Sequence, residues 1–151
     1  MACEKIFLKR LRESGLRLTP QREMILAVMH QLEGVSTVEE IYGRVHAQSS
    51  TVDISTVYRT LELLQGFKLV ARIDAGSDQH RYELLGVHGP HLHLACQSCG
   101  KVIGVSLAEA EPFVAHLRAA YDFEAELDNV TIPGLCGECR SAASQRLAPA
   151  I

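Results

Sequence analysis

Hydrophobic positions in the first half of the chain recur at the spacing of an amphipathic helix, in segments separated by short polar stretches. In the first of these segments, Thr19-Pro20 puts a capping residue before a proline that suits the first helical position. The apolar side chains that follow at helical spacing are Ile25, Val28, Met29 and Leu32. We therefore expect a helix that begins at Pro20 and ends near Gly34.

Two more capped helices are predicted after it. Thr37 and Glu40 have the spacing of a capping box, in which each side chain bonds to the other residue's backbone N–H. The helix behind this box has the apolar residues Ile41, Tyr42 and Val45. Asp53 is placed to cap a third helix, which Gly66 ends. The buried stripe expected on the third helix comprises Ile54, Val57, Leu61 and Leu64.

After the third helix the pattern changes to that of strands. LVARID, a polar AGSD turn and HRYEL predict a two-stranded hairpin. Three short helices followed by a hairpin are typical of a winged helix-turn-helix, whose last helix reads the major groove of DNA. The side chains left to read DNA near the N-terminal end of that helix are Ser55, Thr56, Tyr58 and Arg59. The alternative is a small three-helix core with an incidental polar face.

The second half of the chain changes character at about Leu85. Strict alternation in HLHLAC sends His91 and His93 to one side of a strand and Leu92 and Leu94 to the other. An amphipathic helix is expected over 107–121, and FEAELDNVTIP is expected to form another strand. The predicted fold is α+β, with a winged helix-turn-helix over 1–84 and a small α/β domain over 85–151 that offers apolar surface to a partner subunit. We expect its small-residue tail, from about 141, to be poorly ordered.

Four of the five cysteines form two Cys-x-x-Cys pairs, Cys96/Cys99 and Cys136/Cys139. Four thiolates in two such pairs can close a tetrahedron around one zinc ion, and that shell leaves no open position for chemistry. Because positions 100 to 135 separate the pairs, the zinc would staple a whole subdomain. Two unrelated thiol pairs or two disulfides are the alternatives.

The His-x-His pair is a candidate for a second metal site. Neutral imidazoles at alternate strand positions point the same way and suit zinc, iron, nickel or manganese. Carboxylates have to complete the shell, and Glu83 is the nearest candidate, followed by Glu111 and Asp128. The alternative is a pair of histidines that are satisfied in the core or at the surface.

Length, charge and composition limit the functional classes. At 151 residues with 47% hydrophobic positions, the chain can bury a core in one domain or two small ones. The net charge is −3, but residues 1 to 22 have more basic than acidic side chains, as a DNA-binding end or a solvated amphipathic helix would. No apolar run could span a bilayer and no signal-peptide core is present, so we expect a cytoplasmic protein with reduced thiols and no membrane partner.

No motif indicates an enzyme. Zinc-dependent nucleobase deaminases combine a cysteine pair with His-x-Glu, which is missing upstream of Cys96. Neither a Ser, His and Asp set nor a phosphate-cradling glycine loop is found.

Several motifs, in matching order and spacing, resemble the ferric uptake regulator (Fur) family of metal-responsive dimeric repressors, which includes iron, zinc, manganese, nickel and peroxide sensors. They are GLRLTPQR (15–22), DISTVYRTLELL (53–64), RYEL (81–84), HLHLACQSCGKVI (91–103) and PGLCGEC (133–139). The resemblance covers about residues 5 to 140. It implies that the four paired cysteines hold a structural zinc and that the second domain forms a homodimer.

Further roles follow from the resemblance, residue by residue. Glu83, His91 and His93 match ligands of a regulatory site between the DNA-binding and dimerisation domains, and Glu111 matches a carboxylate of an additional site. The residues implied at the DNA are Arg17, which reaches the adjacent groove, Arg22, which contacts phosphate, and Tyr58 and Arg59.

The regulatory site departs from the family pattern at Val35, where many members have a histidine. A substitute ligand is therefore required. By proximity in the sequence the candidates are His80, Glu33 and Asp74, with His30 a weaker one because it shares a helix face with core residues.

The additional site also departs from the pattern. Leu92 breaks the triple-histidine run, and Asp128 stands where a histidine is common, so this site is reduced to Glu111 and Asp128 with help from His88. Gly104 stands where peroxide-sensing members carry an aspartate ligand.

These features predict a metal-dependent repressor of metal-ion homeostasis genes that responds to iron or zinc. Regulatory metal binding would orient two winged helices of a dimer on a palindromic double-stranded DNA operator. The expected cofactors are a structural Zn²⁺ and a regulatory Fe²⁺ or Zn²⁺. The alternatives are a peroxide- or manganese-sensing member of the family, or a zinc-stapled interaction module that does not bind DNA.

Overall fold

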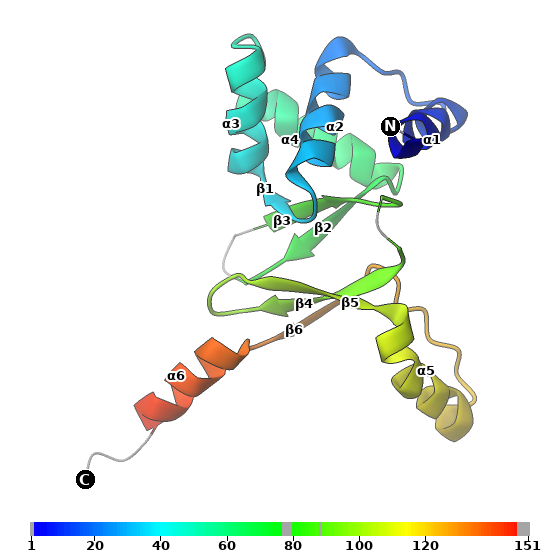
Figure 1. The fold of residues 1–151 in the computed structure, drawn as a ribbon, viewed down its shortest axis with the longest axis vertical. Coiled ribbons are helices and arrows are strands. Elements are labelled where there is room, and N and C mark those ends of the chain that lie inside the picture. The colour runs from blue at the N-terminus through cyan, green and yellow to red at the C-terminus, as the bar shows by residue number, and fades with distance from the viewer. Residues whose placement is uncertain (1, 77–79, 88, 148–151) are drawn as a thin grey trace. The chain divides into compact units, whose positions relative to one another are not determined.

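The computed structural model describes residues 2–76, 80–87 and 89–147. The chain divides into two compact units, residues 1–72 with 80–88 and residues 73–79 with 89–151. The N-terminal elements are α1 (Ala2–Glu13), α2 (Pro20–Leu32), β1 (Ser36–Thr37), α3 (Val38–Gln48), α4 (Ile54–Gly66), β2 (Val70–Asp74) and β3 (His80–Leu84) (Figure 1). The C-terminal elements are β4 (His91–Cys96), β5 (Val102–Ser106), α5 (Leu107–Tyr121), β6 (Thr131–Gly134) and α6 (Gly137–Leu147).

The predicted caps begin the helices of the first unit. The Thr19 hydroxyl accepts the backbone N–H of Arg22 at 3.3 Å at the start of α2, whose first residue is a proline. Thr37 and Glu40 form the full capping box of α3, with bonds of 2.8 and 3.2 Å. Each bond satisfies an N–H that has no partner within the helix, so these helices begin where the sequence predicted.

The helices of the first unit pack around one continuous apolar core. On α4, Val57, Leu61 and Leu64 are fully buried, as expected. Ile54 was predicted to join them, but its side chain is 38% exposed, whereas Thr60 is buried. At about 100° per residue, Ile54 lies roughly 70° from the centre of the buried stripe, which explains why this prediction was wrong.

The two strands of the predicted hairpin are present as the neighbours β2 and β3, and a third strand extends their sheet. Residues 77 and 78 of the predicted AGSD turn lie outside the described residues. The sheet order is β1-β3-β2, with β1 antiparallel to β3 and Ser36 opposite Tyr82. At two residues, β1 is too short to show an alternating pattern in the sequence. Tyr82 and Leu84 belong to the core of the first unit, so the intervening Glu83 points to the other face of β3.

The second unit is built on a sheet of order β5-β4-β6, in which β4 is antiparallel to β5 and parallel to β6. Helix α5 has the predicted bounds. The predicted strand over 123–133 is mostly wrong, because only Thr131–Gly134 forms β6. Before it, Asp128 and Asn129 make a turn, with Asn129 at φ +60°, a conformation that ends an extended strand.

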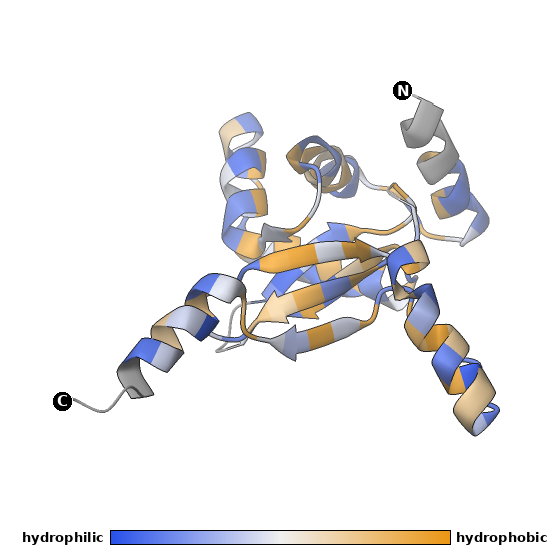
Figure 2. Cartoon of the chain, turned by 60° about the horizontal axis from the view of Figure 1, so that its bottom comes forward, coloured by the Kyte–Doolittle hydropathy of each residue, from blue (hydrophilic) through white to orange (hydrophobic). Residues whose placement is uncertain are grey.

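One face of this sheet is a row of apolar side chains. Leu94 is paired with Ile103 on β5 and with Ile132 on β6, so the three side chains lie side by side. Ile103 and Ile132 are 41% and 43% exposed. Figure 2 shows hydrophobic positions along the strands of this sheet, with α5 and α6 extending away from opposite ends of it. In the described part of the chain, this face is therefore partly exposed.

Helix α6 occupies most of the segment that was predicted to be poorly ordered. The backbone N–H of Arg140 donates to the carbonyl of Cys136 at 2.9 Å, so the helix starts from the second cysteine pair. The alanines of the segment also favour a helix. The last four residues, 148–151, lie outside the described part. Among the described residues, no helix is long and apolar enough to cross a membrane.

Candidate metal centres and DNA-binding helix

The four paired cysteines come together in the second unit. Their sulfur atoms all lie within 4.8 Å of one another, and the Sγ atoms of Cys99 and Cys136 are 3.8 Å apart. With Zn–S bonds of about 2.3 Å, the edge of a tetrahedral four-thiolate site is about 3.8 Å. A disulfide needs about 2.05 Å. The donor set and its spacing therefore fit a four-thiolate zinc site.

Backbone hydrogen bonds hold the first pair in place. Cys96 ends β4, its N–H donates to the carbonyl of Lys101 at 2.8 Å, and the N–H of Gly100 donates back to the Cys96 carbonyl at 3.0 Å. The N–H of Gln97 donates to the Gly134 carbonyl at 2.9 Å, which ties the pair to the end of β6, just before Cys136. The fold thus brings together two pairs that are distant in the sequence.

The thiols differ in their affinity for protons. Backbone N–H groups of Cys136 and Cys99 stabilise the Cys96 thiolate and lower its pKa to about 6. The Ser98 hydroxyl favours the Cys139 thiolate, but hydrogen bonds with the other three cysteines outweigh it and raise the pKa of Cys139 to about 12. Four adjacent thiolates need a cation to be stable, so metal binding at this cluster releases protons.

His91 and His93 converge on the other face of β4. Their Nε2 atoms are 3.1 Å apart, and His91 Nδ1 is 2.7 Å from the carbonyl oxygen of Gly89. Since a carbonyl only accepts, the proton of a neutral His91 is on Nδ1, and its Nε2 is left with a lone pair. With metal–nitrogen bonds of about 2.0 Å, two imidazoles at a tetrahedral metal have nitrogens about 3.3 Å apart. The pair therefore has the spacing of metal ligands, and His91 has the tautomer of one.

Glu83 is a buried residue of β3 in the first unit. His80 lies three positions earlier on the same strand, so it points to the opposite face from Glu83. A small pocket in the same unit is lined by Glu83 together with His30 and Glu33. Of the substitutes considered for the missing histidine at Val35, His30 and Glu33 are thus better placed beside Glu83 than His80 is.

In the described part of the chain, the residues of the additional site do not form a cluster of three metal-ligating side chains. Glu111 on α5 faces Arg118, with an O···N distance of 3.9 Å, and Asp128 is exposed in the turn before β6. Among the described residues, neither carboxylate belongs to a group of three or more clustered metal-ligating side chains. His88 lies outside the described residues.

The N-terminal turn of α4 carries an ordered polar network around Asp53. Its Oδ1 accepts hydrogen bonds from the Thr56 N–H (2.8 Å), the Thr56 hydroxyl (2.7 Å) and the Ser55 hydroxyl (3.0 Å). These bonds, above all that from the Thr56 hydroxyl, lower the pKa of Asp53. Arg59 in turn donates to the Ser55 hydroxyl and carbonyl at 3.3 Å. The sequence predicted Asp53 as a cap, but it did not predict that this carboxylate hydrogen-bonds two of the candidate reading residues, Ser55 and Thr56.

The other candidate DNA contacts are placed as follows. Tyr58 is exposed on α4, one turn after the exposed Ile54, so both side chains are on the outer face of the helix. Arg17 is exposed in the loop before α2, and its carbonyl accepts a 2.7 Å hydrogen bond from the guanidinium of the half-buried Arg22. Arg22 therefore braces the loop that carries Arg17.

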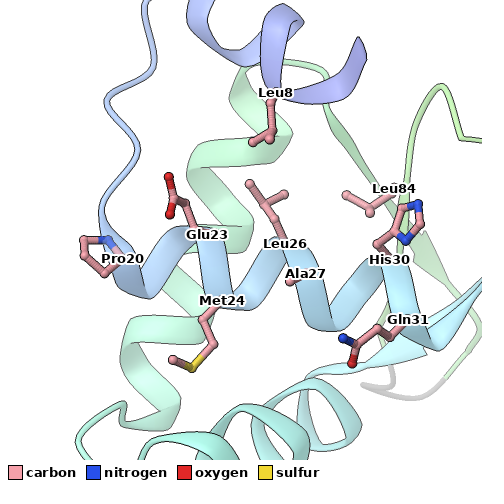
Figure 3. A pocket seen from close by; sticks show the side chains of 9 residues that line it. All are labelled: Leu8, Pro20, Glu23, Met24, Leu26, Ala27, His30, Gln31 and Leu84. Carbon is pink, nitrogen blue, oxygen red and sulfur yellow. The ribbon is translucent and has the colours of Figure 1, made fainter. Parts of the chain in front are cut away.

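The first unit also has a pocket of about 500 Å³ between α1 and α2 (Figure 3). Its lining is mostly apolar, and the ionisable side chains in it are Glu23 and His30. Among the described residues, no group of three metal-ligating side chains faces it. The pocket thus lacks the clustered metal-ligating side chains found at the four cysteines and at the histidine pair.

Comparisons with known proteins agree with this arrangement. The ferric uptake regulation protein of Campylobacter jejuni is 33% identical over 138 residues, which cover 89% of this chain and 87% of that protein. The peroxide-responsive repressor PerR of Staphylococcus epidermidis is 28% identical, over 86% of this chain and 85% of that protein. The structure of the Helicobacter pylori ferric uptake regulator, described as having three functional metal binding sites, has a TM-score of 0.73 and 26% identity, over 90% of this chain and 93% of that chain. The model of the ferric uptake regulator family matches residues 13–132, and the chain belongs to that family.

Proposed function

We propose that this chain is a dimeric repressor of metal-ion homeostasis genes that binds its DNA operator when a regulatory metal is bound. The observation that carries the proposal is the pair of imidazoles on β4, with Nε2 atoms 3.1 Å apart and His91 fixed by the Gly89 carbonyl. Ligating histidines in metal sites commonly donate their second N–H to a carbonyl in this way. The four-cysteine cluster holds a structural zinc and has no open position for a signal.

The regulatory metal is held by His91, His93 and Glu83, as the family resemblance implies, with Glu33 or His30 in place of the missing histidine. Both substitutes line the same small pocket as Glu83, which supports them over His80. A shell of two imidazoles and two carboxylates, with Glu33, contains harder ligands than an all-nitrogen shell and suits Fe²⁺. Zinc is the alternative, and His30 in place of Glu33 would favour it.

Helix α4 reads the operator in this proposal. The hydroxyls of Ser55 and Thr56 donate to the Asp53 carboxylate, so towards DNA they present lone pairs. Such acceptors match the amino groups of adenine and cytosine in the major groove. Tyr58 and Ile54 offer apolar contact to thymine methyl groups, and Arg59 can bond to guanine or phosphate.

The proposed dimer forms through the apolar row of Ile103, Leu94 and Ile132. Ile103 and Ile132 are partly exposed in the single chain, and an apolar sheet face of this kind suits a second copy. Two α4 helices related by a two-fold axis would read a palindromic operator, with half-sites about one or more helical turns apart.

The decisive experiment replaces both histidines, His91→Ala with His93→Ala, and compares metal content and operator affinity with those of the wild type. The double variant should keep one equivalent of zinc at the cysteines while operator binding no longer responds to Fe(II), Zn(II) or Mn(II). His116→Ala is the matched control, because it removes an exposed histidine of the same unit. A double variant that still responds to metal like the wild type would place sensing elsewhere.

A second experiment tests the reading helix. Arg59→Ala or Tyr58→Ala should weaken operator binding by about 1 to 3 kcal/mol and leave the metal content unchanged. Arg140→Ala removes the same charge from an exposed position on α6 and should have little effect. If Arg59→Ala and Arg140→Ala behave alike, α4 does not read the operator.

A peroxide-sensing role is the second candidate, favoured by the similarity to the Staphylococcus epidermidis repressor. Gly104 argues against it, because the resemblance places an aspartate ligand of peroxide sensors at this position. Loss of operator binding in the iron-loaded protein, but not in the zinc-loaded protein, on addition of peroxide would favour this role.

A further inference from the structure

We propose that the guanidinium of Arg118 is the resident cation at the place of the additional metal site, so that Glu111 holds no metal in this chain. The family resemblance assigns Glu111 and Asp128 to that site. The side chains present do not fit it, because a fixed positive charge already faces the carboxylate expected to bind the ion.

Arg118 is held on both sides. Its Nε and Nη2 atoms donate to the two oxygens of Glu124 at 2.7 and 2.8 Å, a bidentate pairing. Its Nη1 is 3.9 Å from Glu111 Oε1. Glu111 and Arg118 are seven residues apart on α5, two turns along the same helix face, while Glu124 follows the helix end at Asp122.

In the sequence around Arg118, no other lysine or arginine is present to pair with the nearby carboxylates. Between 107 and 128 it is the only lysine or arginine, and it is accompanied by six carboxylates. Those carboxylates are Glu109, Glu111, Asp122, Glu124, Glu126 and Asp128. Glu124 stabilises the charged guanidinium and raises the pKa of Arg118, and Arg118 in return lowers the pKa of Glu124. An acidic segment that would otherwise suit a divalent ion thus contains its own cation.

The pairing also has a mechanical consequence. Asp122 ends α5 in the left-handed conformation, at φ +50°, and the chain turns back so that Glu124 meets Arg118. The fork of Arg118 therefore fastens the irregular segment 122–128 to the helix before that segment leads into β6. A metal ion bridging Glu111 to Asp128 would fasten the same two segments, so one cross-link takes the place of the other.

The test measures metal stoichiometry in the full chain with its structural zinc in place. Wild type, Glu111→Gln and Glu126→Gln are dialysed against Mn(II) or Zn(II), and bound metal is measured by mass spectrometry. Glu126 is the matched control, an exposed carboxylate in the same acidic segment. We expect the same metal-to-protein ratio in all three proteins. Loss of one equivalent in Glu111→Gln, but not in Glu126→Gln, would overturn the proposal.

Hydrogen exchange of the amides in 118–128 tests the cross-link itself. Arg118→Gln and Glu124→Gln should each speed exchange there by about two- to fivefold, as expected for an exposed but bidentate pair. The double variant should be no faster than either single variant, because both remove the same interaction. Additive effects, or unchanged exchange in Arg118→Gln, would show that Arg118 does not fasten this segment.

Discussion

In the first unit, a set of side chains from all its helices is buried together, whereas in the second unit several of the largest apolar side chains lie at the surface. Among the described residues, the buried apolar side chains of the second unit are Ile73, Ala75, Leu92, Ala95, Cys96 and Val114. Its exposed large apolar side chains are Ile103, Phe113, Tyr121, Phe123, Ile132 and Leu135.

The difference has a physical explanation. A small unit that buries little apolar surface cannot offset the conformational entropy lost on folding. The second unit compensates with four thiols gathered for a metal and, in our proposal, with a second copy against its apolar row. The first unit needs neither, because its core is closed within one chain. The following predictions test this contrast.

The largest effect is expected from Cys139→Ser. Binding of structural zinc contributes about 10–16 kcal/mol in small zinc-dependent folds, so its loss should unfold the second unit and abolish the dimer. The helices of the first unit should persist, which hydrogen exchange resolved by segment can show. Cys3→Ser, which changes the one cysteine outside the cluster, should keep zinc and dimer. A stable, dimeric, zinc-free Cys139→Ser protein would show that the second unit does not depend on a metal at the four cysteines for its stability.

Leu61→Ala should have the complementary effect. The fully buried side chain lies in the core of the first unit, and its truncation should lower the free energy of unfolding by about 2–5 kcal/mol. Zinc content and dimerisation should be unchanged. Chemical denaturation measures the free energy of unfolding, and size-exclusion chromatography with metal analysis measures dimerisation and zinc content. If Leu61→Ala also released zinc, the two units would not be stabilised independently.

Ile132→Asp tests whether the apolar row forms the dimer interface. The side chain is already 43% exposed in the single chain, so the folded monomer should tolerate the change, while a buried charge in a dimer interface should weaken association at least about tenfold. Analytical ultracentrifugation at several protein concentrations measures the dimer dissociation constant. Glu126→Gln serves as a surface control. Unaltered dimerisation would mean that the second copy binds another face.

The smallest effect concerns pH. Because Arg118 lowers the pKa of Glu124 below its ordinary 4.5, this pair stabilises the fold above that value and its contribution is lost as pH falls through the lowered pKa. The difference in melting temperature between wild type and Glu124→Gln should therefore shrink on acidification from pH 6 to below the pKa. A difference that is constant across this range would show that the ion pair does not contribute.

Local signals allowed much of the first unit to be predicted. Cap residues act within one helical turn, so Thr19, Thr37 and Asp53 marked the helix starts correctly. Ile54 was misplaced because burial depends on which side of α4 meets its neighbours, and spacing alone does not define that side sharply. In the second unit, the strand predicted before Thr131 failed because a turn at Asn129 and the pairing of Glu124 with Arg118 shape that segment.

The sequence by itself determined the family, the helix starts and the chemistry of the ligands, because these depend on residue type and short spacing. The tertiary structure decided which of these groups meet. It gathered four sulfur atoms from two distant pairs, turned His80 and Glu83 to opposite faces of one strand, and gave Glu111 an arginine as its partner. Such pairings depend on strand register and on where the chain turns back, and contacts made far along the sequence fix both.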